Sequence, residues 1–201
     1  MRIGMLGGTF DPVHLGHLIG AQAAWEGLGL DRVLFVPAAR PPHKLEAAIT
    51  PAKHRVEMLR LALAGDSRFV LYLDEIDRRG RSYTVDTLRR YREKELQPGD
   101  ELYFILGDDN LLEFDTWKDW RRIGAQARLA ALGREGFTAD RRILEEKLDG
   151  IEVLRIEMPL IGISATGVRA ACAAGKPIRY LVPEPVAEYI ERHGLYRNVR
   201  S

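Results

Sequence analysis

Short apolar runs alternate with helix-forming stretches along most of this 201-residue chain. Runs typical of buried strands lie at residues 2–6, 33–36, 69–73, 102–106, 128–132 and 153–156. Patterns typical of helices lie between them, at residues 15–28, 51–64 and 85–96. Strands that alternate with helices favour parallel pairing with right-handed crossovers. We therefore expect an α/β fold, an open parallel sheet with helices on both faces.

The C-terminal part of the chain, from about residue 164, has a helical pattern and no further strand. Pro183 is expected to open the final helix. Thr50 and Pro51 predict the N-cap and the first residue of the helix that begins there. No repeat, low-complexity tract or long linker divides the sequence. We expect one domain over residues 1–201, with a small C-terminal helical part.

The composition is that of an ordinary globular protein, with 46% hydrophobic and 29% charged residues. A formal net charge of +1 gives no reason to expect a nucleic acid or an anionic membrane as a partner. No apolar run reaches the roughly 18 residues that a membrane span needs. Cys172 is the single cysteine, which excludes an intrachain disulfide and favours a buried apolar role for this side chain. We expect a cytoplasmic enzyme, and the sequence leaves open whether it forms a homo-oligomer.

The most informative segment has the sequence GGTFDPVHLGH, at residues 7–17, between the first predicted strand and the first predicted helix. Gly7 and Gly8 let the backbone approach a ligand closely at the end of the strand. His14 and His17 are three residues apart, so they project from the same face of the first helical turn. Rossmann-like sheets bind nucleotides at this kind of place, beyond the carboxyl ends of the strands and beside a helix N-terminus.

The same segment has further features that suit a phosphate. Thr9 and Phe10 offer backbone amides, whereas Asp11 and Pro12 are expected to shape the turn. The two standard nucleotide fingerprints are absent, because no GxGxxG follows the first strand and no GxxxxGK[S/T] occurs anywhere. Any nucleotide bound here therefore uses another phosphate cradle.

A second candidate segment, PAARPPHK at residues 37–44, follows the second predicted strand. Its prolines stiffen the loop, which lowers the entropy cost of presenting Lys44 to a phosphate. His43 is the weaker candidate, because its ring can equally cap or pack. Alone, such a segment is typical of a surface loop, so its interpretation depends on the neighbouring motif.

A third candidate segment, ISATGVR at residues 163–169, begins a predicted helix. Ser164 is its expected N-cap, which leaves the first amides and the positive end of the helix dipole for an anion. Thr166 and Arg169 are three residues apart, so one helix face offers a hydroxyl and a guanidinium. Alone, these residues equally fit an ordinary capped helix.

The His-x-Gly-His pattern of residues 14–17 resembles the signature of the nucleotidyltransferase α/β-phosphodiesterase superfamily, whose members join a nucleotide α-phosphate to an acceptor and release pyrophosphate. The chain is similar to the bacterial nicotinate-nucleotide adenylyltransferases in further segments, in family order: residues 37–44, 81–88 (RSYTVDTL), 106–110 with Trp117, and 163–169. This resemblance implies transfer of the adenylyl group of ATP to nicotinate mononucleotide. The implied products are deamido-NAD and pyrophosphate, in NAD biosynthesis.

For the ATP site, the resemblance implies binding by Gly7, Gly8, Thr9, Phe10, His14, His17, Gly107, Asp109, Ser164, Thr166 and Arg169. The implied catalytic residues are His14, His17, Lys44 and Arg169. His17 would lie nearest the transferring phosphate, Asp109 would accept hydrogen bonds from a ribose, and the Ser-x-Thr-x-x-Arg element would grip the β- and γ-phosphates. Ala165 stands where the family often has serine, a position outside those three donors.

For the acceptor site, the resemblance implies binding by Lys44, Tyr83, Thr84, Trp117 and Arg134. Tyr83 and Thr84 would receive the pyridine carboxylate at a helix N-terminus. Trp117 would stack on the pyridine ring, with a purely structural tryptophan as the alternative. Arg134, after a predicted strand, is a weaker candidate for a phosphate contact. Asp86 and Trp120 are expected to be structural.

No metal site built by the protein is expected. The histidines that zinc would need lie in a phosphate-type loop, and no Cys/His cluster completes four ligands. A Mg²⁺ carried mainly by the ATP phosphates fits better.

Other functions remain as alternatives. The first is an adenylyltransferase for another acceptor, either nicotinamide mononucleotide or phosphopantetheine. The second is a module that binds a nucleotide without turnover, although His17 and the Ser-x-Thr-x-x-Arg donors are intact. The third is an RNA-handling domain, because His-x-Gly-His also resembles class I aminoacyl-tRNA synthetases. The short chain, its +1 charge and the lack of a Lys-Met-Ser-Lys-Ser-like loop weigh against that third alternative.

Overall fold

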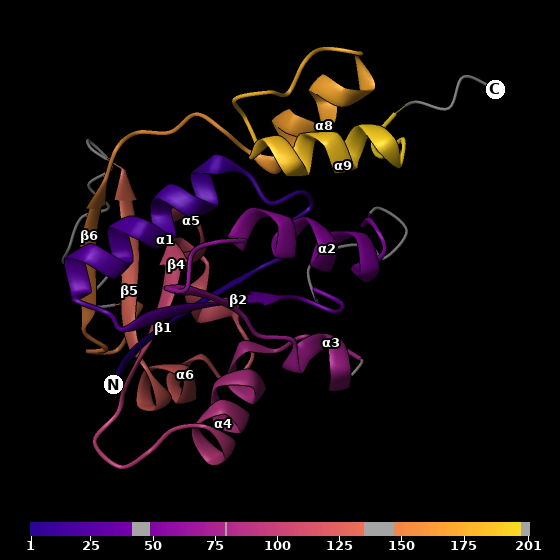
Figure 1. The fold of residues 1–201 in the computed structure, drawn as a ribbon. Coiled ribbons are helices and arrows are strands. Elements are labelled where there is room, and N and C mark those ends of the chain that lie inside the picture. Colours follow the sequence, from indigo (N-terminus) through magenta and orange to yellow (C-terminus); the bar gives the residue numbers. More distant parts are fainter. Residues whose placement is uncertain (42–48, 79, 135–146, 198–201) are drawn as a thin grey trace.

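The computed structural model describes residues 1–41, 49–78, 80–134 and 147–197, without the side chain of Arg134 (Figure 1). Within these residues, six strands form one parallel sheet with the order β3-β2-β1-β4-β5-β6. The strands are β1 Arg2–Gly8, β2 Arg32–Pro37, β3 Phe69–Leu71, β4 Glu101–Gly107, β5 Arg128–Arg134 and β6 Val153–Met158. The expected open parallel sheet is confirmed, with each predicted strand end shifted by no more than two residues.

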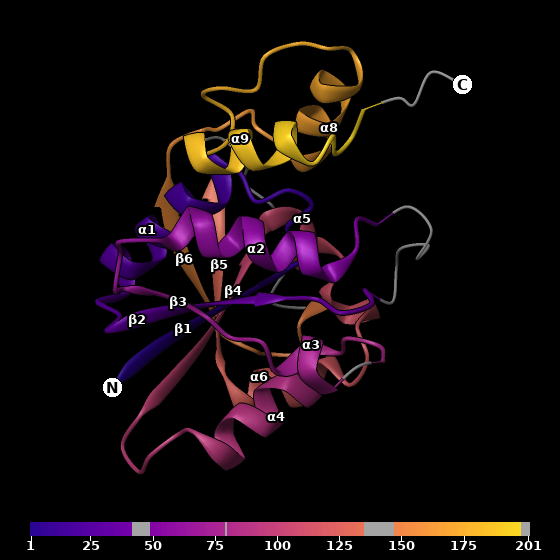
Figure 2. The same ribbon diagram turned by 45° about the vertical axis from the view of Figure 1, so that its right-hand side comes forward.

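Helices cover both faces of this sheet. The described helices are α1 Leu15–Leu28, α2 Ala52–Leu63, α3 Asp74–Arg78, α4 Thr84–Lys94, α5 Asp108–Leu112, the 3₁₀ helix η2 Phe114–Thr116, α6 Trp120–Gln126, α8 Ala165–Ala173 and α9 Glu184–Arg192. Helices α1 and α2 lie on one face, with α8 and α9 beyond them, whereas α3, α4 and α6 lie on the other (Figure 2). In the described part of the chain, no helix has the length and apolar character needed to cross a membrane.

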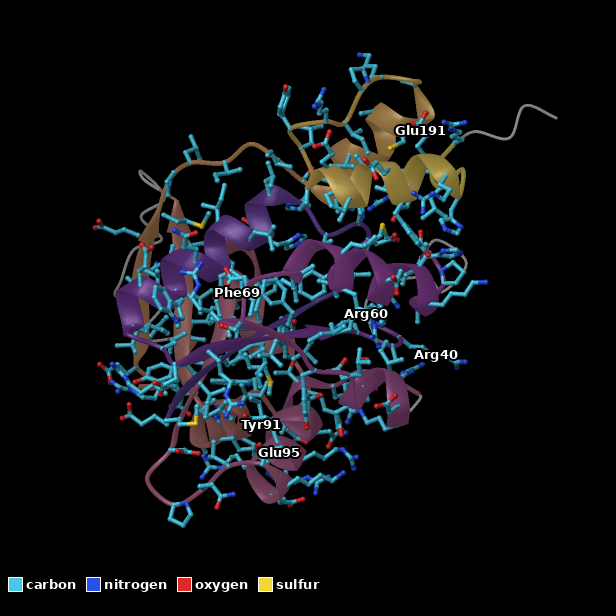
Figure 3. All side chains as sticks on the ribbon, viewed as in Figure 1. Arg40, Arg60, Phe69, Tyr91, Glu95 and Glu191 are labelled. Atoms are coloured by element: carbon cyan, nitrogen blue, oxygen red, sulfur yellow. The ribbon has the colours of Figure 1, made fainter. Side chains whose placement is uncertain are left out.

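The core consists of two apolar layers, one on each face of the sheet. Successive side chains of a strand point to opposite faces, so Ile105 of β4 packs with the α1 and α2 layer and Phe104 with the other. Both faces are buried, which explains why the strands are uninterrupted apolar runs. Figure 3 shows the two layers, with Phe69 in one and Tyr91 in the other. Cys172 packs, half-buried, against the α1 and α2 layer.

One predicted helix boundary is wrong. Pro51 occupies the N-cap position of α2 and the helix begins at Ala52, so Thr50 lies outside it. The physical reason is tertiary contact. Thr50 donates its backbone N–H to Asp11 Oδ2 (3.0 Å), and its carbonyl accepts from Arg55 Nε (2.9 Å). These two bonds fix the backbone of Thr50 in a position that the local pattern does not reveal.

The connection of the strands creates a crevice beside β1. From β1 the chain moves outward through β2 and β3, and then returns to pair β4 with the opposite side of β1. Ligands of open α/β sheets bind where the strand order reverses in this way, beyond the carboxyl ends of the strands. β1 ends at Gly8 and β4 ends at Gly107. The segment of residues 7–17 therefore begins at this crevice.

Candidate functional site

A cavity of about 870 Å³ opens at the carboxyl ends of β1 and β4. Predicted site residues that line it are Gly7, Gly8, Thr9, Phe10, His14, His17, Tyr83, Thr84, Gly107, Asp109, Trp117 and Arg169. Ser164 and Thr166 are not among its lining residues. Lys44 and His43 lie outside the described residues, as does the side chain of Arg134. The fold thus brings most of the predicted nucleotide and acceptor residues to one cavity.

The two histidines form a stacked pair at the start of α1. Their ring centroids are 3.7 Å apart and the ring planes differ by 28°. His17 Nδ1 accepts the backbone N–H of His14 (3.2 Å), which leaves the ring proton of neutral His17 on Nε2. Only 7% of His14 is exposed, and its Nδ1 has no hydrogen-bond partner among the described residues. Burial lowers the pKa of His14 to about 4, so this ring is neutral at pH 7.

Two local features allow this stacking. A Cβ on Gly16 would lie 3.0 Å from Nδ1 of His14, so only glycine lets the helix backbone pass so close to the ring. On the other side, the Phe10 ring contacts His17 edge-on, with centroids 5.0 Å apart. Phe10 has φ +49°, a left-handed conformation that a bulky residue rarely adopts. The loop therefore holds a strained backbone where it places this ring against His17.

The burial of His14 makes stability depend on pH. The folded state holds its pKa near 4 and the unfolded chain near the ordinary 6.5, so the unfolded chain binds the proton preferentially between these values. The stability that neutral His14 contributes is complete above about pH 6.5 and is lost as the pH falls toward 4, on the order of 3 kcal/mol. Urea unfolding at pH 7 and pH 4.5 should therefore show a smaller loss for His14→Asn than for the wild type. Equal losses would contradict the buried neutral state.

Asp11 anchors the loop between β1 and α1. It is 4% exposed, and its carboxylate accepts the Thr50 backbone N–H (3.0 Å) and the Tyr196 hydroxyl (2.6 Å). Its backbone carbonyl accepts a hydrogen bond from Arg169 Nη1 (2.7 Å). Asp11 thus shapes the loop, as the sequence predicted, and also joins it to segments far away in the chain.

Arg55 is a second anchor, and no sequence motif pointed to it. Its side chain is almost fully buried and donates to three carbonyls: Nη1 to Thr9 (2.8 Å), Nε to Thr50 (2.9 Å) and Nη2 to Ala39 (3.4 Å). Burial lowers the pKa of Arg55, and the nearby Asp11 carboxylate opposes that shift. The guanidinium therefore ties the loop after β1 to the loop after β2.

The start of α8 closes another side of the cavity. Ser164 Oγ accepts the Gly167 backbone N–H (3.1 Å), which confirms it as the N-cap. Arg169 Nη2 lies 3.2 Å from Thr166 Oγ1, so the hydroxyl and the guanidinium do share one face. Ala165 and Arg169 line the cavity, whereas Ser164 and Thr166 are exposed beside it. The position where the family often has serine is thus on the cavity wall.

The N-terminus of α4 forms the opposite wall. Tyr83 occupies its N-cap position and Thr84 is its first residue, and both line the cavity. Lys118 Nζ lies 4.4 Å from the centroid of the Tyr83 ring and 3.3 Å from Asp86 Oδ2. Asp86 is thus held in the first turn, as expected, and Lys118 adds a positive charge that the sequence motifs did not predict.

Trp117 stands between the core and the cavity. Its half-buried ring packs against Phe114 (centroids 5.5 Å apart) and Phe104 (6.0 Å), and it also lines the cavity. Trp120 packs against Phe114 and is not among the lining residues. The structure therefore places Trp117 on the cavity wall and leaves Trp120 in a structural position.

A buried carboxylate, Glu75, also lines the cavity beside the start of α4, and no sequence motif pointed to it. It accepts the Thr87 hydroxyl at 2.5 Å, and burial raises its pKa while hydrogen bonds from Ser82 and Thr87 oppose that shift. Ser82 Oγ accepts the Ala39 backbone N–H (2.8 Å), and its own N–H donates to the Arg40 carbonyl (3.0 Å). The side chain of Arg40 lies at the edge of the molecule (Figure 3). This network joins the loop after β2 to the loop before α4.

The remaining predicted residues lie at the ends of β4 and β5. Gly107 is the N-cap residue of α5, and the exposed Asp109 follows it on the cavity wall. Its neighbour Asp108 is buried and ion-paired with Arg155. Arg134 ends β5, where its backbone is paired with β6.

Comparisons with known proteins agree with this geometry. Residues 5–171 match the cytidylyltransferase-like family. A probable nicotinate-nucleotide adenylyltransferase of Thermus thermophilus is 50% identical over 197 residues, which cover 98% of this chain and 100% of the relative. Another, of Moorella thermoacetica, is 45% identical over 98% of this chain and 92% of its own length. The fold is similar to Plasmodium falciparum nicotinic acid mononucleotide adenylyltransferase complexed with NaAD, with a TM-score of 0.75, 19% identity and 97% coverage of both chains.

Proposed function

Because the chain belongs to the nicotinate-nucleotide adenylyltransferases, within the cytidylyltransferase-like family, we propose that it transfers the adenylyl group of ATP to nicotinate mononucleotide. The products are deamido-NAD and pyrophosphate. An acceptor phosphate oxygen forms a bond to the α-phosphorus, while the bond from that phosphorus to the pyrophosphate oxygen breaks. The attacking oxygen is already an anion at neutral pH, so the step needs no general base and no covalent enzyme intermediate.

The stacked pair of His14 and His17 at the crevice is the observation that carries this proposal. With Nδ1 occupied, His17 presents its Nε2 proton as a donor to the transferring phosphate. His14 supplies a neutral ring beside it. Arg169, with the first amides of α8, suits the charge that grows on the departing pyrophosphate. Catalysis is then positioning together with charge stabilisation.

On the acceptor side, the N-terminus of α4 supports a site for the pyridine carboxylate. Amides at a helix start favour an anion, and Lys118 adds positive charge beside Tyr83. Trp117 would stack on the pyridine ring. Lys44 and Arg134 remain proposed phosphate contacts, on the strength of their sequence positions alone.

ATP is proposed to act as its Mg²⁺ complex. In the described residues, no group of three or more His, Cys, Asp and Glu side chains could hold a metal ion. The donors on the nucleotide side are imidazoles and a guanidinium, which suit phosphate oxygens, whereas Mg²⁺ prefers oxygen ligands. The triphosphate and water would therefore supply most of the ligands, and the ion would neutralise charge on the leaving pyrophosphate.

We also propose that residues 1–201 work as one nucleotidyltransferase domain in the cytoplasm. Apolar residues of α8 and α9 belong to the same buried cluster as α1 and α2, which supports a C-terminal part integral to the domain. The proposed partners are the two small substrates, with neither nucleic acid nor membrane among them.

Pyrophosphate release from Mg-ATP tests the function directly, with nicotinate mononucleotide, nicotinamide mononucleotide and phosphopantetheine as parallel acceptors. Strong release is expected with the first. Nicotinamide mononucleotide should react poorly, because the backbone N–H groups at the start of α4 would then face an NH₂ group, which cannot accept their hydrogen bonds. Release with only another acceptor would keep the phosphate site and overturn the roles of Tyr83, Thr84 and Trp117. ATP binding with no release at all would indicate a nucleotide-binding module.

Trp117→Ala should raise the KM for nicotinate mononucleotide by about tenfold, because an aromatic stacking partner is worth roughly 1 kcal/mol or more. The KM for ATP should change little. Trp120→Ala is the matched control, since this ring packs on the same Phe114 without lining the cavity. An unchanged acceptor KM in Trp117→Ala would return Trp117 to a purely structural role.

A further inference from the structure

The hydroxyl of Tyr196 reaches back across 185 sequence positions to the loop that follows β1. We propose that Tyr196 is a positioning residue for the ATP site, which acts on Arg169 and on the phosphate loop through Asp11. The proposal rests on the proposed function only in taking this loop as the ATP site. It adds a role for a residue outside every segment that pointed to the function.

The bonds at Asp11 form a continuous path. Tyr196 donates to Asp11 Oδ1 at 2.6 Å, and Thr50 donates its N–H to Oδ2 at 3.0 Å, so both carboxylate oxygens are held. A hydroxyl bond to a carboxylate is among the stronger hydrogen bonds in proteins. The carbonyl of the same residue accepts from Arg169 Nη1 at 2.7 Å. A shift of Asp11 therefore moves the acceptor that orients the Arg169 guanidinium toward the cavity.

The backbone on both sides of this contact is strained. Tyr196 has φ +62°, and Phe10, directly before Asp11, has φ +49°. Large side chains rarely adopt this left-handed conformation, and they keep it only where the surrounding structure over-determines it. Such strain is typical of functional positions. Here it brings the Tyr196 hydroxyl and the Asp11 carboxylate together.

The hydroxyl is also a permanent donor. Burial and the neighbouring Asp11 carboxylate raise the pKa of Tyr196 far above its ordinary value, so the group stays protonated at every working pH. Another hydrogen bond also joins the C-terminal part to the start of α1, where the Leu15 N–H donates to the Leu181 carbonyl (3.0 Å). Helices α8 and α9 lie directly beyond α1 and α2 (Figure 1). The C-terminal part thus contacts the nucleotide loop and the start of α1 at three points, through Tyr196, Arg169 and Leu181.

The test compares Tyr196→Phe with Tyr189→Phe. Both variants lose one hydroxyl from the C-terminal part, but Tyr189 bonds to His54 Nδ1 (2.9 Å), and neither of those residues lines the cavity. Binding of a non-hydrolysable Mg-ATP analogue is measured by calorimetry, and KM is measured for each substrate. Tyr196→Phe should weaken analogue binding and raise the KM for ATP by about tenfold, as expected for one lost charge-assisted hydrogen bond. The acceptor KM should stay unchanged, and Tyr189→Phe should match the wild type.

Other outcomes separate the hypotheses. Analogue binding by Tyr196→Phe that equals the wild type, or equal loss in both variants, overturns the positioning role. A wild type that binds the analogue but releases no pyrophosphate refutes the proposed function, while the comparison of analogue affinities still decides the role of Tyr196. If Tyr196→Phe fails to fold, Asp11→Asn, which keeps the shape but weakens the acceptor, provides the same test through ATP affinity. In a folded double variant, effects that simply add would show that Tyr196 does not act through Asp11.

Discussion

His17→Ala is expected to lower the rate of pyrophosphate release at saturating substrates by about 10²–10³-fold, the usual cost of removing one preorganised donor to a developing charge. The His17 ring is fixed on one side by the backbone N–H of His14 and on another by the edge of Phe10. In the proposed site, His17 would therefore meet the phosphate without reorganisation. The fold should survive, because the side chain is only half-buried. Steady-state kinetics, together with circular dichroism and thermal melting, measures both quantities.

His54→Ala is the matched control for this experiment. His54 lies on α2, bonds to the Tyr189 hydroxyl and is not among the residues that line the cavity. Its replacement should leave the rate within about twofold of the wild type. A near-normal rate for His17→Ala would show that His17 does not donate to the transferring phosphate. A large loss in both variants would point to general damage instead of a lost donor.

Arg55→Met should destabilise the protein by about 3–5 kcal/mol, as expected when one partner of a buried charged network is removed. Methionine has a similar length but donates nothing, so the carbonyls of Thr9, Thr50 and Ala39 lose their guanidinium donor. The buried Asp11 carboxylate also loses the nearby positive charge. Urea unfolding monitored by fluorescence gives the change in free energy.

Arg60→Met on the same helix is the control. Arg60 is exposed on α2 (Figure 3), and its replacement should change stability by no more than about 0.5 kcal/mol. A similarly small change in the free energy of unfolding for Arg55→Met would contradict this prediction. It would mean that the three hydrogen bonds of the Arg55 guanidinium stabilise the folded state no more than hydrogen bonds to water stabilise the unfolded state.

Periodicity was sufficient to predict the sheet because every strand is buried on both faces, which makes a run such as residues 102–106 apolar throughout. The five-residue helices α3 and α5 were not predicted, since they are too short to show a period. Thr50 was misplaced as an N-cap because its backbone is held by partners distant in the sequence. Local rules for helix ends contain no information about such partners.

The candidate site was predictable to the extent that its residues are contiguous. The glycines and histidines of residues 7–17 form a motif that can be recognised in the sequence. Glu75 and Tyr196 belong to no such motif, because their hydrogen-bond partners lie elsewhere in the chain. Arg55 did leave a signal, because it stands on the apolar face of α2 with Met58 and Leu59. A charge at a core-facing position is costly unless it is paired, so it predicts a buried network without naming its members.

The hydrogen bond between Asp11 and Tyr196 also has a consequence for how the protein is made. Asp11 is synthesised 185 residues before its partner Tyr196, an interval of about 10 to 40 s at ordinary rates of translation. During this interval the loop after β1 cannot have its full set of hydrogen bonds. A nascent chain therefore holds an unfinished nucleotide loop, and the loop acquires its native bonds only when the C-terminal segment has emerged and docked.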